Sequence, residues 1–351
     1  MRKTAAKLLA VAALATSVAT IASGTAIADP TVTPAATDIV SVGSDTTQAV
    51  SNQFSTDYNA YLASIGDTTS PRYYSWDATG SATINLRAGV SNFNRPNGSG
   101  AGITALNALN SPVDVARSSR GPKANPGGDP TTDVFVAFAK DAVSWSAPAT
   151  GYAPADLTTV QLKSIYECGT TDWHTIVPSV PAGTTIKPYL PQSDSGTRAF
   201  FLTAIGNPAL GPCVTTGPQE NEGTDAAFTN PASLFPYSVA HYIGQVYGGH
   251  SSGTDAPGSL TIRTVDGLSP LTAANTLSPQ FAATPYGRTV YNVVRQGDWT
   301  ASNARGTALR NIFGPASTNG WICKNGTSII KNYGFLPLPG TACGSTIQNT
   351  V

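Results

Sequence analysis

Strand-like runs alternate with helical patterns along most of this chain, and polar turns separate several of them. Residues 38–42 form a β-branched run that ends at a Gly-Ser-Asp-Thr-Thr turn, and apolar residues then recur at helical spacing from Val50 to Leu62. Residues 186–190 and 199–205 repeat this order around a second polar turn. This alternation predicts an α/β fold. Further strand-like runs lie at 113–116, 134–139, 289–294 and 334–338, and a helix is predicted at 157–166 with Thr158 or Asp156 as its cap.

The length allows two ordinary domains, because 351 residues with 40% hydrophobic content can bury a sizeable core. The Gly/Ser-rich stretch 246–260 reads as a loop or a crossing between domains. Acidic and basic residues number 20 each, so the chain lacks the positive charge that nucleic-acid binding needs. We therefore expect no nucleic-acid partner.

The N-terminus has the three parts of a secretory signal peptide. A basic start precedes an apolar stretch over residues 8–22, and Ala26-Ile27-Ala28 provides a cleavage site of small residues. Cleavage after Ala28 would leave a Pro/Thr/Ala-rich flexible leader at 29–37. No cysteine lies at the cleavage site to carry a lipid, and no later stretch is long and apolar enough to span a bilayer. We expect a secreted, extracellular protein.

The four cysteines fit an oxidising compartment and indicate two disulfides. Nearness in sequence favours Cys168–Cys213 and Cys323–Cys343, although three pairings are possible. A metal site is the alternative, but close spacing of the C-x-x-C kind is absent. We expect no metal and no cofactor.

Four polar turns, at 43–47, 97–102, 117–122 and 192–198, each follow a strand-like run. A helix N-terminus offers unpaired N–H groups and a partial positive charge, and Ser/Thr hydroxyls and glycines add donors and close backbone approach. Each turn alone is more often an ordinary helix cap. Together, at the carboxyl edge of an α/β sheet, such turns can bind an anion such as phosphate.

These turns resemble a family. Gly43-Ser44-Asp45-Thr46-Thr47, Gly98–Gly102 and Ser195-Gly196-Thr197 occur in the order seen in the phosphate-binding components of bacterial phosphate ABC transporters (PstS-like proteins with a type II periplasmic-binding-protein fold, or PBP domain). Segments 288–294 and 333–338 are also similar to that family, so the resemblance spans about residues 38–340. It implies two lobes joined by a hinge of crossing strands, with phosphate or a related oxyanion in the cleft between them.

The resemblance also implies boundaries, contacts and partners. Lobe 1 would comprise residues 38–130 plus 262–345, and lobe 2 residues 131–261. The protein would bind without covalent chemistry, and an ABC transporter permease would be its ordinary partner. Because no cysteine at the cleavage site provides a lipid anchor, an extracellular scavenger is the alternative. We expect a monomer. The ligand-binding residues that it implies are Ser44, Asp45, Thr46, Ser99, Ser119, Ser195, Gly196, Thr197 and Arg198.

Two charged residues of the family are missing from their usual places. Ser119 stands where the family has an Asp that accepts a ligand proton, and Pro191 or Gln192 stands where it has an Arg. Asp45 could replace the acceptor. The cation could come from Arg117, Arg120 or Arg198.

Other functional classes remain open from the residues alone. A secreted hydrolase of phosphate esters or glycans could use Ser195 as a nucleophile, but no motif connects it to His174, His241 or His250. The carboxylates of Glu220 and Glu222 could suggest glycosidase chemistry. We expect instead an exposed loop between the lobes, with the alternative that this segment reaches the cleft. A reused binding scaffold with another ligand, such as a sugar, is the third possibility.

Overall fold

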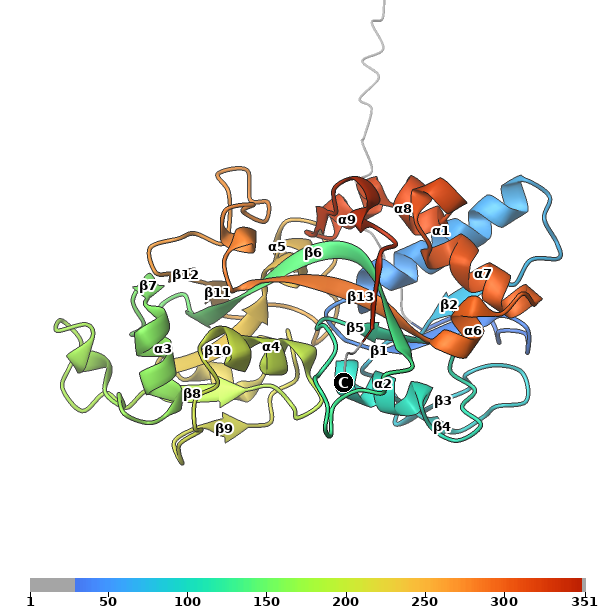
Figure 1. Ribbon diagram of the computed structural model, residues 1–351. Coiled ribbons are helices and arrows are strands. Elements are labelled where there is room, and N and C mark those ends of the chain that lie inside the picture. Colours follow the sequence, from blue (N-terminus) through green and yellow to red (C-terminus); the bar gives the residue numbers. More distant parts are fainter. Residues whose placement is uncertain (1–28, 349–351) are drawn as a thin grey trace, which may run out of the picture.

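The computed structural model describes residues 29–348, so the predicted signal peptide lies outside the described residues. Two α/β parts lie side by side, and two long strands run between them (Figure 1). The strands are β1 Ile39–Gly43, β2 Tyr73–Ser75, β3 Thr83–Ile84, β4 Phe93–Asn94, β5 Val115–Ser118, β6 Asp133–Pro148, β7 Asp156–Leu157, β8 Lys187–Leu190, β9 Thr215–Thr216, β10 Ser233–Ser238, β11 Leu260–Ile262, β12 Thr264–Val265, β13 Gly287–Arg295, β14 Leu336–Pro337 and β15 Thr346–Gln348. The helices are α1 Gln48–Ser64, α2 Ser99–Leu106, α3 Thr159–Tyr166, α4 Gly196–Ala204, α5 Val239–Val246, α6 Gln296–Thr300, α7 Ala304–Phe313, α8 Trp321–Asn325 and α9 Thr327–Asn332.

The first lobe is built on β2, β1, β5 and β13, in that order across the sheet. The strand β1 is parallel to both of its neighbours, and β13 is antiparallel to β5. Ile39 and Val40 enter apolar clusters on opposite faces of this sheet, as the alternation of side chains along a strand requires. Helices α1, α7, α8 and α9 cover one face, and α2 packs on the other.

The second lobe contains β10, β8 and β9, which are parallel to one another, together with α3, α4 and α5. Its core is a separate apolar cluster around Trp145, Trp173 and Phe201, all fully buried. Helix α3 begins with a capping box at Thr158, one of the two caps predicted for it. The Thr158 hydroxyl accepts a hydrogen bond from the Gln161 N–H, and the Gln161 side chain accepts one from the Thr158 N–H.

The long strand β6 belongs to both lobes. Residues 133–142 pair with β13, whereas residues 143–148 pair with β10 and β11. Figure 1 shows β6 and β13 arching together across the middle of the molecule. Side chains at the polar turns of both lobes meet beside these strands, which positions the candidate site.

Most predicted elements are found near their expected positions. The helix predicted at 157–166 is α3, and the runs at 38–42, 113–116 and 289–294 are β1, β5 and β13. Both favoured disulfides, Cys168–Cys213 and Cys323–Cys343, are formed. Within residues 29–348 no helix is long and apolar enough to cross a membrane.

Candidate functional site

Two threonines from different lobes meet at the centre of the site. Thr46 lies just before α1, and Thr197 lies in the first turn of α4. Their hydroxyl oxygens are 3.1 Å apart, and both residues are buried. The N-terminus of α4 therefore faces the loop after β1, so helix N–H groups and two hydroxyls converge.

Three small residues complete this contact. Ser119 donates its N–H to Ser99 Oγ over 3.0 Å, and the two hydroxyl oxygens are 3.3 Å apart. A Cβ added at Gly196 would lie 2.4 Å from Ser99 Oγ and 2.3 Å from Ser119 Oγ. Only glycine lets α4 approach so closely. Ser195 caps the helix, because its Oγ accepts from the Arg198 N–H.

The cation at the site is Arg288, which sequence reasoning did not select. It projects from β13, donates from Nη2 to Thr197 Oγ1 over 2.9 Å, and pairs with Asp141 of β6 over 2.8 Å. Both side chains are almost fully buried. Arg288 Nη1 is also buried, and it has no hydrogen-bond partner among the described residues. The guanidinium thus has one free donor arm.

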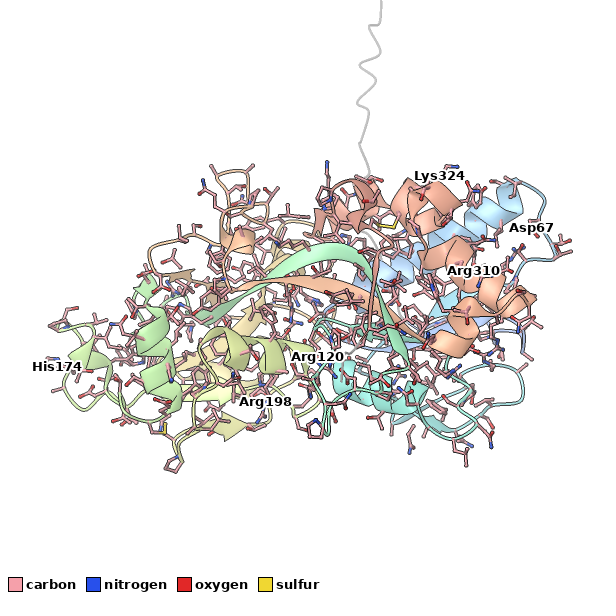
Figure 2. The ribbon with its side chains drawn as sticks, viewed as in Figure 1. Asp67, Arg120, His174, Arg198, Arg310 and Lys324 are labelled. Carbon is pink, nitrogen blue, oxygen red and sulfur yellow. A yellow bond between two sulfur atoms is a disulfide. The ribbon has the colours of Figure 1, made fainter. Side chains whose placement is uncertain are left out.

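The three arginines considered from sequence make other contacts. Arg117 is fully buried and donates to Ser75 Oγ and to the main chain at Ser41 and Ser44. Arg120 pairs with Asp129. Arg198 donates to the Pro191 carbonyl and to Thr216 Oγ1. Figure 2 shows Arg198 on the second lobe and Arg120 near the middle of the molecule. None of the three has a hydrogen bond to Thr46 or Thr197 in the described structure.

Asp45 is buried beside the site rather than bonded to its hydroxyls. Its carboxylate accepts from Asn221 Nδ2 over 2.9 Å. Burial raises the pKa of Asp45 well above its usual range, which the nearby His241 partly opposes. Ser44 Oγ is buried and has no hydrogen-bond partner among the described residues.

The segment that contains Glu220 and Asn221 reaches the site, so the expectation of an exposed loop there was wrong. Both residues are fully buried. Glu220 Oε1 accepts from Thr46 Oγ1 over 2.7 Å and from the Thr197 N–H over 3.3 Å. Its second oxygen, Oε2, is buried and has no hydrogen-bond partner among the described residues. A carboxylate therefore lies at the N-terminus of α4.

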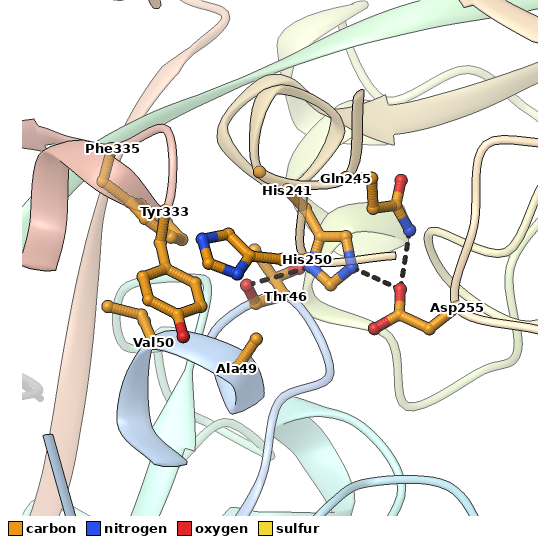
Figure 3. Close-up of a pocket in the computed structure, with 10 residues that line it drawn as sticks. Thr46, Ala49, Val50, His241, Gln245, His250, Asp255, Tyr333 and Phe335 are labelled. Carbon is orange, nitrogen blue, oxygen red and sulfur yellow. Dashed lines mark hydrogen bonds and ion pairs between the residues drawn. The ribbon is translucent and has the colours of Figure 1, made fainter. Parts of the chain in front are cut away.

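A second polar cluster adjoins the site on α5 (Figure 3). His241 faces the Asp255 carboxylate over 2.7 Å through Nε2 and the Thr46 carbonyl over 3.3 Å through Nδ1. Gln245 donates to the same carboxylate. Burial lowers the pKa of His241, but Asp255 outweighs that effect and raises it to about 10. The ring is therefore an imidazolium that donates from both nitrogens.

A small cavity borders that cluster. The cavity has a volume of about 10 Å³ and is lined by Thr46, His241, His250 and Tyr333 among others. His250 stacks on Tyr333 with ring centroids 3.8 Å apart. His174 lies at the far end of the second lobe (Figure 2). Among residues 29–348 no group of three or more potential metal-ligating side chains comes together.

The charged residues of the site carry no local sequence signal for this role. Arg288 and Asp141 lie within strands and carry no local motif. Only the pairing of β13 with β6, at Arg288 opposite Asp141, brings them together. Glu220 comes from a loop of ordinary polar composition. The turns were detectable because a helix cap leaves a local signal, whereas a pair across two strands does not.

Two lobes that share long crossing strands, with helix N-termini and polar turns facing each other beside them, define a type II periplasmic-binding-protein-like molecule. The chain belongs to the PBP superfamily domain family, whose model matches residues 28–308. No curated protein matches this sequence.

Solved structures share the fold at low identity. A protein from Clostridium perfringens, assigned as a phosphate ABC transporter substrate-binding protein and solved with bound phosphate, has a TM-score of 0.56 at 16% identity, covering 86% of this chain and 99% of that one. An ABC-type phosphate transport receptor from Vibrio cholerae has a TM-score of 0.53 at 16% identity, with 86% and 100% coverage. A phosphate-binding protein from Stenotrophomonas maltophilia has a TM-score of 0.50 at 15% identity, with 87% and 91% coverage.

Proposed function

We propose that this protein is a solute-binding protein that holds phosphate or a related oxyanion between its two lobes. The observation that carries the proposal is the buried guanidinium of Arg288, which donates from Nη2 to Thr197 Oγ1 beside the Thr46 hydroxyl and keeps Nη1 without a hydrogen-bond partner among the described residues. A cation, neutral hydroxyls and helix N–H groups together are the donors that an oxyanion needs. The similar structures support phosphate, because they are named as phosphate-binding or phosphate-transport proteins.

Binding in this site needs no covalent step. Thr46 belongs to the first lobe and Thr197 to the second, so a ligand held by both would link the lobes, and lobe movement would release it. Asp141 neutralises much of the Arg288 charge, so specificity rests on hydrogen bonds more than on net charge. The hydroxyl of Ser195 serves as a helix cap in this arrangement, which suits a binding protein better than a hydrolase.

Isothermal titration of the purified protein with phosphate and with sulfate tests the proposal. Thr197→Val removes one hydroxyl that faces Thr46, and Thr203→Val removes an exposed hydroxyl from the same helix as the matched control. We expect the unmodified protein to bind phosphate. Thr197→Val should weaken that binding by roughly tenfold, the equivalent of one hydrogen bond, whereas Thr203→Val should leave it unchanged. Absence of binding by any oxyanion would contradict the proposal.

The proposed role as a solute-binding protein also suggests where the protein acts and what it interacts with. We propose that the protein acts outside the cytoplasm as a monomer, that it is not an enzyme, and that an ABC transporter permease receives its ligand. The two disulfides support an oxidising compartment. Light scattering during size-exclusion chromatography, with and without phosphate, would give the mass in solution. A dimer would contradict the monomer proposal.

A further inference from the structure

One carboxylate oxygen occupies the donors that the proposed ligand would use. Glu220 Oε1 accepts a hydrogen bond from the Thr46 hydroxyl over 2.7 Å and another from the Thr197 N–H over 3.3 Å. These donors come from different lobes, so the carboxylate connects them, as we propose for a bound oxyanion. An oxyanion oxygen and a carboxylate oxygen accept the same hydrogen bonds, so both cannot hold these donors at once.

The neighbouring residue holds the loop in place. Asn221 donates from Nδ2 to Asp45 Oδ1 over 2.9 Å in the first lobe, and its Oδ1 accepts from the Ser238 N–H over 3.0 Å in the second. Its carbonyl accepts from Gln245 Nε2 over 2.9 Å. Glu220 itself is tied through its N–H to Gln192 Oε1. The carboxylate is thus presented by a loop that is anchored on both sides.

Two buried side-chain atoms, each on a residue that bonds to Thr197, remain without partners among the described residues. They are Glu220 Oε2 and Arg288 Nη1. Glu220 forms no ion pair with Arg288 within 4.0 Å, so its charge is met only by a hydroxyl and an N–H group. Unpaired buried polar atoms are costly, and the carboxylate is therefore a weaker occupant than an oxyanion that also engages the free arginine arm.

We propose that Glu220 is a built-in competitor, a carboxylate that occupies the oxyanion position and holds the lobes together until an external oxyanion displaces it. This inference rests on the proposed function. It makes the protein a receptor whose affinity is set by exchange between an internal and an external anion. It also gives the 217–225 loop a role in release, because return of Glu220 to Thr46 and Thr197 would expel the ligand.

Titration of phosphate into Glu220→Gln tests the exchange. The amide keeps the size of the side chain but removes the negative charge, so the internal occupant is weakened. We expect phosphate to bind roughly tenfold or more tightly than to the unmodified protein. Glu222→Gln is the matched control, since it changes a carboxylate of the same loop that has no hydrogen bond to Thr46 or Thr197, and it should leave the affinity unchanged.

Equal or weaker phosphate binding by Glu220→Gln would overturn the inference. Weaker binding together with new sulfate binding would overturn it in favour of a carboxylate that accepts a ligand proton.

Small-angle scattering in phosphate-free buffer gives a readout that does not depend on phosphate. Glu220→Ala should increase the radius of gyration, because one link between the lobes is lost, whereas Glu222→Ala should not. If no variant binds phosphate, the proposed function fails, and an unchanged radius for Glu220→Ala then overturns the lobe-linking role as well. An increased radius would support that role alone.

Discussion

At the residue scale, the Arg288–Asp141 pair holds the site together. Asp141 accepts from Arg288, from Ser238 Oγ over 2.8 Å and from the Ala240 N–H over 2.9 Å, so its carboxylate is well satisfied although fully buried. A buried ion pair adds little net stability compared with apolar packing, but removal of one partner leaves an uncompensated charge. The pair therefore matters most when it is broken.

Arg288→Ala should lower the free energy of unfolding by about 3–5 kcal/mol, because Asp141 would remain buried without its cation. Urea denaturation of the two proteins measures the difference. Arg198→Ala is the control, since Arg198 is only partly buried and bonds to a carbonyl and a threonine, and it should cost less than about 1 kcal/mol. A similar loss of unfolding free energy in both variants would show that the Arg288–Asp141 pair does not contribute more than a partly buried arginine.

His241 gives the stability a pH dependence of known sign. Its folded-state pKa of about 10 lies above the unfolded value of 6.5, so its contribution is complete below pH 6.5 and is lost as the pH rises towards 10. Between pH 6.5 and 10, the loss of the imidazolium should lower the free energy of unfolding by up to about 1.4 kcal/mol per pH unit. Burial also raises the pKa of Asp45, so the contribution of that carboxyl is lost as the pH rises above its unfolded value of 3.8.

The control for this prediction is His241→Gln, which cannot form an imidazolium. Urea denaturation at several pH values between 6.5 and 10 should show a smaller slope for the variant than for the unmodified protein. Equal slopes would mean that other groups, such as lysines and tyrosines, cause the loss of stability.

The sequence predicted the hydroxyls of the site better than its charges. Thr46 and Thr197 lie next to helix starts, where capping residues and glycines leave a local pattern. Arg288 meets Thr197 only because β13 runs beside β6, and nothing near Arg288 in the sequence encodes that pairing. Long-range contacts of this kind depend on the whole topology.

At the element scale, glycine at the start of α2 permits contact between the lobes. Gly98 has a φ of +102°, and a Cβ there would lie 2.4 Å from the Asp194 carbonyl oxygen. The Gly100 N–H also donates a hydrogen bond to that oxygen over 3.0 Å. The helix N-terminus of the first lobe is thus bonded to the loop that precedes α4 in the second.

Gly98→Ala should hold the lobes apart and weaken phosphate binding by roughly tenfold or more, because the added methyl group meets a backbone atom. Gly89→Ala introduces a similar backbone strain at φ +81° in open space, so it should leave binding unchanged. Titration calorimetry on both variants separates the effect of contact from the effect of strain. Loss of binding in both would point to strain alone.

Elements with a strong local signal were predicted accurately. Thr158 and its capping box mark the start of α3, and the β-branched run 38–42 became β1. The loop around Glu220 was expected to be exposed because its composition is polar. It is buried because other buried polar groups, such as Asp45 and Ser238, bond to it, and composition alone does not reveal such partners.

At the scale of the whole molecule, we propose that the chain crosses from the first lobe to the second along β6 and returns along β13. The expected return to the first lobe was at residue 262. Val265, Leu277 and Tyr286 nevertheless pack in the apolar cluster of the second lobe. We therefore place the proposed return at the start of β13, near residue 287.

Each disulfide lies within one lobe, so the bonds should affect stability without restricting lobe movement. Cys168–Cys213 closes a loop of 45 residues and Cys323–Cys343 one of 20. In the chain-entropy account, replacement of the cysteines by alanine should cost about 4 and about 3 kcal/mol respectively. Urea denaturation would measure these losses, and phosphate titration should show little change in affinity. A strong loss of affinity would mean that a disulfide positions the site.

The long crossing strands also determine the order in which the two lobes can finish folding during synthesis. One edge of β5 is covered by β13, whose residues 287–295 follow the entire second lobe in the sequence. Until those residues emerge from the ribosome, the first lobe carries an uncovered strand edge, which is a template for aggregation. The nascent chain therefore passes through a vulnerable interval that ends only when residues 287–295 have emerged.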